Sequence, residues 1–340
     1  MTPAGDRRRL ADACVLVPRI LSGQAQSLPG CARASVIDDA ELTSTGVAVI
    51  KLAPADQPPC LVVKVPTTTA ALAGLERESA ALGALHGDER LGDWRARLPR
   101  PYASGTALDQ RFRADAALPG RPAAERVDGA AAAVRLQEAA AESIHVLHRS
   151  TATSVAVDRS VAERWIDGQL GDLSRHAGGR RRRAWRLGRL REELHGAVIG
   201  RTFSTAWIHG DYWLGNVLVD EASPTPRGIV DWDDAAPGEL PLHDLLHLLL
   251  YTRRLLTDQE LGQIVCRQLA GGEWSGSERR LLERYGCWCD GGALSDRHAL
   301  LLYWLRHVAL HARQQRDRPG PRYRIWERRN VSSVLAAAWS

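Results

Sequence analysis

The pattern of hydrophobic and polar positions divides the chain into a strand-rich first third and a helix-rich remainder. Residues 46–66, GVAVIKLAPADQPPCLVVKVP, contain two β-branched runs joined by a turn with Pro and Asp, which predicts a β-hairpin. Lys64 lies near the end of the second predicted strand. Residues 100–117 are expected to add further strand, so this part of the chain predicts a small antiparallel sheet.

The segment that follows the hairpin predicts one amphipathic helix. In residues 67–86, TTTAALAGLERESAALGALH, a threonine cluster can cap the helix, and Leu75 and Leu82 recur at helical spacing. Glu78 lies on the same stripe. A carboxylate on a face that packs against a sheet is costly unless a cation meets it. Lys64, on the preceding strand, is the available partner.

The rest of the chain predicts mainly helices. The sequence LPGRP at residues 118–122 is a breaker and the predicted hinge, and residues 131–150, AAAVRLQEAAAESIHVLHRS, predict one long helix. More helices are expected in the C-terminal third. Because 340 residues exceed what one hydrophobic core comfortably supports, we predict an α+β fold with two lobes, residues 1–117 and the larger, mainly helical residues 123–340.

The composition is that of an ordinary soluble protein, with 44% hydrophobic and 25% charged residues. There is no run of about 18 apolar residues, and the first residues lack the apolar core and cleavage site of a signal peptide. We therefore expect a cytoplasmic protein without membrane contact. The cysteines form no CxxC pair and are expected to be reduced and mostly buried; they are Cys14, Cys31, Cys60, Cys266, Cys287 and Cys289.

The net charge of +5 is small for this length, and no aromatic-basic repeat accompanies it, so no nucleic-acid partner is expected. Residues 178–196, GGRRRRAWRLGRLREELHG, contain four consecutive arginines. They could form an anion-binding patch, but a solvated helix face is favoured because arginine is the default basic residue of this chain. Of the 45 basic residues, only Lys51 and Lys64 are lysines.

Two short stretches hold the residues with the clearest chemistry. IHGDYWLGNVLVD at residues 208–220 and GIVDWDDA at residues 228–235 each place acids beside an apolar run that predicts a short strand. If the two strands are adjacent, Asp211, Asn216 and Asp231 lie at one end of a hairpin-like unit. Carboxylate and amide oxygens in such a set suit Mg²⁺.

Phosphoryl transfer fits this set of residues. The reaction needs a cation on the phosphates, a metal held by oxygen ligands, and a base aligned with the attacking hydroxyl. The chain supplies candidates for these parts in the order Lys64, Glu78, Asp211, Asn216 and Asp231.

The motifs resemble the aminoglycoside phosphotransferase family, which are small-molecule kinases with a protein-kinase-like fold. The resemblance rests on HGDYWLGN at residues 209–216, IVDWD at residues 229–233 and LPLHDLLH at residues 240–247. The spacing of the first two motifs is a specific signal. Weaker matches follow the family's order, so that the resemblance spans about residues 40–255; they are Lys64, ERE at 76–78, LPG at 118–120 and Leu147 with His148.

For the N-terminal lobe, the resemblance implies a nucleotide-binding antiparallel sheet with one helix, and ATP as the co-substrate. Lys64, held by Glu78, would contact the α- and β-phosphates. The loop ELTSTGVAV at residues 41–49 contains a single glycine, which departs from a glycine-rich phosphate cover. Ser44, Thr45 or backbone amides are expected to serve instead.

For the catalytic chemistry, the resemblance implies Mg²⁺- and ATP-dependent transfer of a phosphoryl group to a hydroxyl of a small molecule. Asp211 would orient or deprotonate the acceptor hydroxyl, and Asn216 and Asp231 would ligate Mg²⁺. His209 and Asp244 would be structural, fixing the catalytic loop through hydrogen bonds.

Plainer interpretations of these residues remain as alternatives. Asp211 and Asn216 could be turn residues, although Asp231 after a separate apolar run favours a shared site. His243 and His247 have the i, i+4 spacing that can bind zinc. An Asp where zinc proteases have Glu, together with the leucine-rich surroundings, favours packing roles for them. A nucleotide-binding pseudokinase without turnover is the alternative outside enzymes.

The acceptor is the open part of the prediction. Family members phosphorylate aminoglycosides, macrolides, choline, homoserine, sugars and other metabolites. Cationic aminoglycosides favour acidic pockets, whereas residues 158–193 contain ten arginines and six acidic residues, which favours a sugar, an aminocyclitol or a related neutral or anionic metabolite. An antibiotic-inactivating aminoglycoside or macrolide kinase remains an alternative, since Asp233, Asp234 and Glu239 could receive an amine. Trp213 could stack on a sugar face. ATP versus GTP and the oligomeric state stay open.

Overall fold

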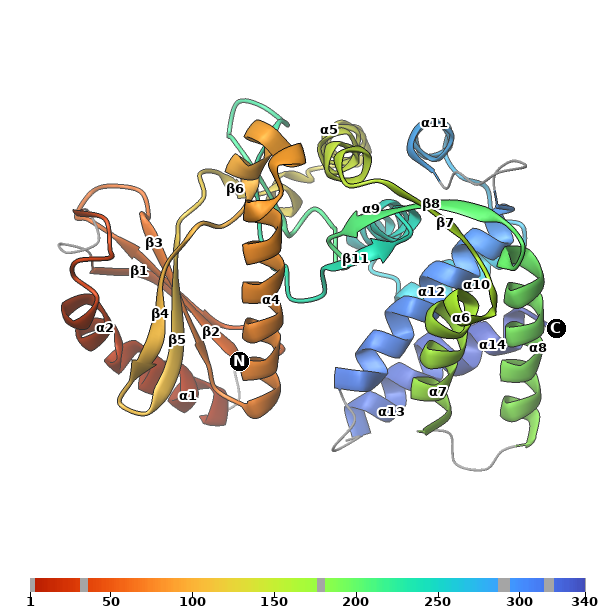
Figure 1. Cartoon of the computed structure of the whole chain (residues 1–340), viewed down its shortest axis with the longest axis horizontal. Helices are drawn as coiled ribbons and strands as arrows, with labels where there is room; N and C mark the ends of the chain where they lie inside the picture. Colours follow the sequence, from red (N-terminus) through yellow and green to blue (C-terminus); the bar gives the residue numbers. More distant parts are fainter. Residues whose placement is uncertain (1–3, 31–35, 176–180, 287–293, 315–320, 340) are drawn as a thin grey trace. The chain divides into compact units, whose positions relative to one another are not determined.

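The computed structural model of the protein describes residues 4–30, 36–175, 181–286, 294–314 and 321–339. The chain forms two compact units (Figure 1). The sheet unit contains residues 1–121 and 216–235, and the helical unit contains residues 122–215 and 236–340. None of the described helices combines the length and the apolar character needed to cross a membrane.

The predicted α+β fold, with a sheet-bearing part and a mainly helical part, is confirmed. The first boundary between the units lies within the short strand β6 (Arg121–Pro122). This position falls in the segment 118–122 that the sequence marks as a breaker. Its action as a hinge stays a prediction.

Residues 216–235 belong to the sheet unit by their contacts, whereas the sequence analysis placed them in the larger lobe. They contain β9 (Val217–Val219) and β10 (Pro226–Ile229), which pair as an antiparallel hairpin. Trp232, just after β10, packs edge-on against Trp94 with ring centroids 6.2 Å apart. This long-range aromatic contact is not visible in the sequence pattern.

The sheet unit is built on a five-stranded antiparallel sheet with the strand order β1-β2-β3-β5-β4. The predicted hairpin at residues 46–66 is its centre, with Leu52 opposite Leu61 and Val49 opposite Lys64. The strands are β1 (Val36–Leu42), β2 (Val47–Ala53), β3 (Leu61–Pro66), β4 (Pro101–Ala107) and β5 (Gln110–Ala116).

The two faces of this sheet differ in polarity because successive side chains of a strand point to opposite faces. On one face, the apolar residues of β2, β3 and β5 form a core with α1 (Ala4–Val15) and α2 (Val17–Gly23). Leu16 and Ile20 are buried in that core. The N-terminal segment, to which the sequence analysis gave no role, therefore covers the apolar face of the sheet.

The other face carries Lys64 and packs against α4 (Thr69–Gly87), as predicted from the leucine stripe. Thr68 caps this helix by accepting a hydrogen bond from the amide of Ala71 at 3.1 Å. Figure 1 shows α2 and α4 on opposite sides of the sheet. The stripe of α4 with Leu75, Glu78 and Leu82 is buried. The short helix η1 (Glu89–Arg97) follows α4 in the chain.

The helical unit contains a small antiparallel sheet and many helices. The sheet order is β11-β8-β7, formed by Ala236–Glu239, Thr202–Ile208 and Thr153–Ala156. The predicted helices at 131–150 and within 178–196 are present as α5 (Ala130–Ser150) and α8 (Arg181–Val198). The helix α9 (Leu242–Thr257) is buried on most of its surface, as expected for a central helix.

The remaining elements of the helical unit pack on α9 or on one another. The long helix among them is α12 (Asp296–Gln314), which packs on α9 and α7. The others are η2 (Ala123–Arg126), α6 (Arg159–Ala162), η3 (Glu163–Asp167), α7 (Gly168–Arg175), α10 (Leu261–Leu269), α11 (Gly276–Tyr285), α13 (Pro321–Glu327), η4 (Arg328–Ser332) and α14 (Ser333–Ala337).

The cysteines that the structure describes are free thiols, as expected, but they are less buried than predicted. Cys14, Cys60 and Cys266 are each partly exposed. Cys14 and Cys60 pack against the core of the sheet unit. The other three cysteines, at positions 31, 287 and 289, lie outside the described residues.

The close approach of Gly120 to β9 predicts a specific stability effect. Gly120 has a φ angle of +100°, and a Cβ atom there would lie 2.7 Å from the carbonyl oxygen of Val219. Gly120→Ala should lower the free energy of unfolding by at least about 1 kcal/mol, because the left-handed region alone costs an L residue that much. Gly83→Ala in α4, where a Cβ meets nothing within 4 Å, should raise it by about 0.5–1 kcal/mol. Urea denaturation compares the two variants, and equal effects would contradict this account of Gly120.

Candidate active site

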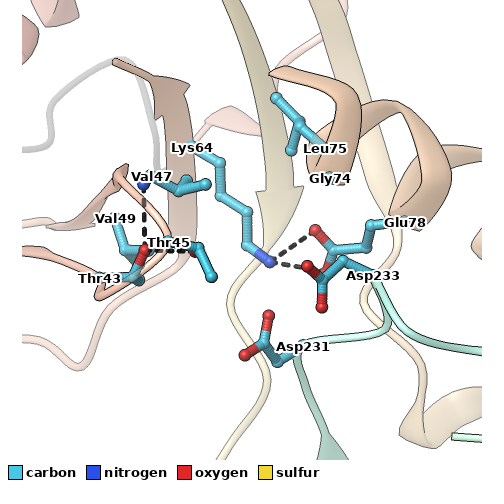
Figure 2. A pocket seen from close by; sticks show the side chains of 10 residues that line it. All are labelled: Thr43, Thr45, Val47, Val49, Lys64, Gly74, Leu75, Glu78, Asp231 and Asp233. Atoms are coloured by element: carbon cyan, nitrogen blue, oxygen red, sulfur yellow. Dashed lines mark hydrogen bonds and ion pairs between the residues drawn. The ribbon is translucent and has the colours of Figure 1, made fainter. Parts of the chain in front are cut away.

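The two predicted partners in the sheet unit, Lys64 and Glu78, are in contact. The Lys64 ammonium lies 2.6 and 2.8 Å from the two carboxylate oxygens of Glu78 (Figure 2). Only 12% of the Lys64 side chain and 3% of the Glu78 side chain are exposed. The strand β3 supplies the lysine and the buried stripe of α4 supplies the glutamate, so the contact joins the sheet to its helix.

Both members of this pair are charged. Burial disfavours the Lys64 ammonium, but the carboxylates of Glu78 and Asp231 outweigh burial and raise the pKa of Lys64. Burial disfavours the Glu78 carboxylate, but Lys64 and Arg113 outweigh burial and lower the pKa of Glu78. The site therefore holds a fixed cation at neutral pH.

A second buried cation, Arg113, was missed by the sequence analysis. Its Nη2 atom lies 2.8 Å from Glu78 and 2.8 Å from Asp115, and its Nε atom donates to Asp115 at 2.9 Å. Burial raises the pKa of Asp115 despite the charges of Arg113 and Lys64. The available signal was alternation in β5, because QRFRADA places its charged residues on one face, opposite Phe112.

A small open pocket lies beside Lys64 in the sheet unit. Thr43 and Thr45 line one side of the pocket. Figure 2 shows the Lys64 ammonium between these threonines and a group of carboxylates. Apolar side chains complete the wall. The residues lining it are Thr43, Thr45, Val47, Val49, Lys64, Gly74, Leu75, Glu78, Asp231 and Asp233.

The loop before β2 is shaped by threonine side chains. The Thr43 hydroxyl accepts from the amide of Val47 at 3.0 Å and lies 2.9 Å from the hydroxyl of Thr45. Gly46 has a φ angle of +88°, which a residue with a side chain rarely adopts. Of the side chains suggested from the sequence, Thr45 lines the pocket, whereas Ser44 is not among the lining residues. Thr43 was not foreseen.

The predicted metal ligands Asn216 and Asp231 flank the paired ends of β9 and β10. The amide of Val230 donates to the carbonyl oxygen of Asn216 at 3.0 Å, so Asn216 and Asp231 meet at the same end of this hairpin. Asp231 has a φ angle of +70°. A non-glycine residue in this region costs about 1–2 kcal/mol, and strain of this kind concentrates at functional sites.

The chemistry of this corner fits a divalent cation. Burial raises the pKa of Asp233, and the neighbouring carboxylates of Asp234, Asp231 and Glu78 raise it further, which indicates an excess of negative charge. Among the described residues, no group of three or more His, Cys, Asp or Glu side chains is placed to hold a metal alone. Mg²⁺ does not need one, because it binds through one or two carboxylates, water and substrate phosphates.

In the helical unit, Asp244 of α9 holds the loop that follows β8. Its two carboxylate oxygens accept from the amides of His209 and Gly210, each at 2.8 Å, and His148 Nε2 lies 2.9 Å from one of them. Gly210 has a φ angle of +88°. These contacts are of the kind expected for residues that fix a loop. The structural roles of His209 and Asp244 stay predictions.

Asp211, the predicted catalytic residue, is 31% exposed and lies next to a histidine from α9. Its Oδ1 atom is 2.9 Å from His247 Nε2. Burial disfavours the carboxylate, but His247, followed by His209 and His307, outweighs burial and lowers the pKa of Asp211 below its ordinary value. Asp211 is therefore a carboxylate at neutral pH, as a group that receives a proton must be.

The two histidines of α9 differ, although the sequence analysis gave both a packing role. His243 is buried with its Nε2 atom 3.9 Å from Glu239, and burial lowers its pKa to about 3, with Arg306 adding to the shift. His247 contacts Asp211 instead. Their i, i+4 spacing forms no metal cluster within the described part of the chain.

Comparison with known proteins places this site in context. The sequence model of the family described as "Phosphotransferase enzyme family" matches residues 49–282. These residues include most of the residues that line the pocket, the loop at residues 209–216 and α9, whereas Thr43, Thr45 and Val47 of the pocket precede them. A search of curated proteins finds no match.

Several solved structures share the fold. A protein from Ralstonia eutropha, provisionally named an aminoglycoside phosphotransferase, aligns with a TM-score of 0.60 and 14% identity over 94% of this chain and 96% of its own. The GDP complex of aminoglycoside 2'-phosphotransferase-IIIa aligns with a TM-score of 0.54 and 14% identity over 96% of this chain and 98% of its own. APH(3'')-Id from Streptomyces rimosus, in complex with ADP and streptomycin, aligns with a TM-score of 0.50 and 18% identity over 87% of this chain and 98% of its own.

The buried arginine of the sheet unit predicts a non-additive pair of substitutions. Arg113→Met leaves the Asp115 carboxylate buried without its cation and should lower the free energy of unfolding by about 3–5 kcal/mol. The double variant Arg113→Met with Asp115→Leu removes the charges of both residues and should recover part of that loss. Glu78 still has a cation beside it in the double variant, because its ion pair with Lys64 is retained. Urea denaturation at pH 7 of the two single variants and the double variant measures the coupling. A double variant that loses the sum of the single effects would contradict it.

Proposed function

The chain belongs to the phosphotransferase enzyme family, and from this premise we propose that it transfers the γ-phosphoryl group of ATP, with Mg²⁺, to a hydroxyl of a small molecule such as a sugar, an aminocyclitol or a related metabolite. The observation that carries this proposal is the pocket in which the Lys64–Glu78 pair lies beside Asp231 and Asp233. A fixed cation next to oxygen ligands for a metal suits the phosphates of a nucleotide.

The sheet unit is assigned to the nucleotide. Lys64 would contact the phosphates while Glu78 holds its ammonium in place, and the hydroxyls of Thr43 and Thr45 line the same pocket. Asn216 and Asp231 would hold Mg²⁺, which, when bound, neutralises phosphate charge. Relatives of the same fold that carry ADP or GDP support a nucleotide co-substrate.

The helical unit is assigned to the acceptor through Asp211. The acceptor oxygen forms the new bond to the γ-phosphorus, the bond from this phosphorus to the β–γ bridging oxygen breaks, and ADP leaves. Asp211, ionised because of its lowered pKa, orients the hydroxyl and receives its proton. A weakly basic carboxylate suffices because the transition state is loose and the hydroxyl needs little activation.

Aromatic side chains near Asp211 support a sugar-like acceptor. Trp213 is half-buried two residues after Asp211, and its ring lies 5.9 Å from that of Tyr251. Aromatic rings can stack on the apolar face of a sugar or on a cation. Part of the arginine excess at residues 158–193 is already paired with an acid outside that segment, as in the contact of Arg183 with Glu327. A relative with bound streptomycin makes antibiotics a second acceptor class to test.

The decisive experiment is acceptor-dependent ADP release. The purified chain with Mg·ATP is tested against sugars, cyclitols, aminoglycosides, macrolides, choline and homoserine, and one class should stimulate release. Asp211→Ala should lower this rate by at least about 10²-fold, the minimum for loss of a general base, while calorimetry shows unchanged ATP binding. Asp220→Ala, at an exposed carboxylate paired with Arg227, is the control. Near-normal turnover in Asp211→Ala would exclude the assigned role, and ATP binding without any turnover would favour the pseudokinase alternative.

The two lysines of the chain provide a matched test of the nucleotide site. Lys64→Met should raise the KM for ATP about 10-fold or more, because a hydrogen bond from a charged group contributes about 1.5–3 kcal/mol. Lys51→Met should leave the KM unchanged, since Lys51 is 41% exposed and pairs with Asp39 at the surface. Steady-state kinetics at varied ATP measures both. Similar KM values in the two variants would remove Lys64 from the nucleotide site.

A further inference from the structure

A polar chain runs from Asp211 into the core of the helical unit. His247 on α9 has its Nε2 atom 2.9 Å from Asp211 Oδ1 and its Nδ1 atom 3.0 Å from the hydroxyl of Tyr303 on α12. His247 and Tyr303 are almost fully buried, with 1% and 2% of their surface exposed. The imidazole therefore connects the proposed base to a buried hydroxyl.

Aromatic neighbours fix the orientation of the His247 ring. It stacks on Tyr251 with centroids 4.0 Å apart, and the rings of Tyr303 and His307 lie 5.9 and 5.2 Å away. The Tyr251 hydroxyl is in turn 3.3 Å from His307 Nε2. A close-packed ring of this kind has little freedom to rotate, so its Nε2 atom stays on the side of Asp211.

We propose that His247 is a positioning residue for Asp211, fixed by Tyr303 so that it holds the Asp211 carboxylate in the orientation that meets the acceptor hydroxyl. This inference rests on the proposed phosphotransferase function and deepens it. It gives the catalytic carboxylate a partner within its own unit, and it gives a role to a histidine that sequence reasoning assigned to packing.

One arrangement of protons is compatible with both contacts of the neutral imidazole. When the Tyr303 hydroxyl donates to Nδ1, the ring proton resides on Nε2 and faces Asp211. In this structure the Nε2–H direction does not meet the geometry of a hydrogen bond to Oδ1, so the 2.9 Å approach is a close polar contact. Catalytic contacts are often poorly aligned in the absence of substrate and tighten in its complex. His247 then restrains the carboxylate while the acceptor proton moves to it.

His247 also influences the pH range in which Asp211 is charged. Its removal leaves the burial of Asp211, which raises the pKa of that carboxyl group, with less opposition. Because Asp211 must be ionised to receive a proton, activity should then be lost at a higher pH. The other ionisable groups that act on this pair are His209, Tyr251, Tyr303 and His307, and Arg254 and Arg306 act in turn on the tyrosines.

The kinetic test compares variants of the full chain in the ADP-release assay. His247→Leu should lower kcat about 10-fold or more, the loss typical of removing a partner that orients a functional side chain, and should move the acid limb of the pH–rate profile to higher pH. The KM for ATP should not change. His247→Gln retains an N–H donor and should recover part of kcat.

The matched control is His243→Gln, at a buried histidine one helical turn earlier on α9. It should leave both kcat and the acid limb as in the unmodified chain. An unchanged kcat and acid limb in His247→Leu would overturn the proposal. If thermal denaturation shows that His247→Leu does not fold, His247→Gln and Tyr303→Phe are compared instead, and both should lower kcat without changing the KM for ATP.

A spectroscopic measurement separates this inference from the proposed function. In nitrogen-15 NMR spectra, the imidazole signals that disappear in His247→Gln belong to His247. Asp211→Asn should change the Nε2 shift, and Tyr303→Phe should change the Nδ1 shift, whether or not any acceptor is phosphorylated. Unchanged shifts in both variants would overturn the contact. Changed shifts without turnover for any acceptor would count against the proposed function and leave the Asp211–His247 contact supported.

Discussion

The ion pair between Lys64 and Glu78 is the interaction on which the sheet unit depends. A glutamate on the apolar stripe of α4 can be buried only where cations meet it, because an unpaired buried carboxylate is strongly unfavourable. Lys64 and Arg113 meet it from β3 and β5. This requirement fixes how α4 is rotated against the sheet. The buried charged residues lie on the face of the sheet that packs against α4. The opposite face is apolar, and α1 and α2 cover it.

The helical unit handles its buried carboxylates with different partners. Asp244 is fully buried, and it accepts from two backbone amides and contacts His148 rather than a lysine or an arginine. Burial opposes its charge, but these partners outweigh burial and lower the pKa of Asp244. Backbone amides hold a defined geometry and do not titrate. A carboxylate bound by them therefore keeps these contacts over a wide pH range.

Local patterns in the sequence were sufficient for the elements and contacts that depend on near neighbours. The hairpin of β2 and β3, the helix α4 and the meeting of Lys64 with Glu78 followed from alternation, helical spacing and the need to neutralise a buried acid. The motif around Asp211 was recognisable because its residues are close in the sequence. Family resemblance then supplied the expected fold.

The contacts that escaped prediction join residues that are far apart in the sequence. Arg113 reaches Glu78 only because β5 lies next to β3 in the sheet, and this strand order is not encoded in either segment alone. His247 follows Asp211 by 36 positions in the sequence. Its position in a leucine-rich helix fits a packing residue as well as a partner of Asp211, so helical spacing does not distinguish the two roles. The grouping of residues 216–235 with the sheet likewise depends on tertiary contacts such as that of Trp232 with Trp94.

The two groups of proposed functional residues, one in each unit, differ in their electrostatic surroundings. Asp211 already has a histidine beside it, and its charge is stabilised within the protein. Near Lys64, by contrast, Asp231 adopts a strained backbone conformation and neighbouring carboxylates raise the pKa of Asp233. A cation bound there would offset that repulsion, and any ligand that binds only the folded state stabilises it. Under the proposed function, the unfavourable charge near Lys64 is thus a source of affinity for the ligand, whereas the proposed base is already organised by its neighbours. Because relatives at 14–18% identity establish only the fold, this difference between the two parts is an argument from the site itself that the chain binds a metal-nucleotide complex and acts on a hydroxyl.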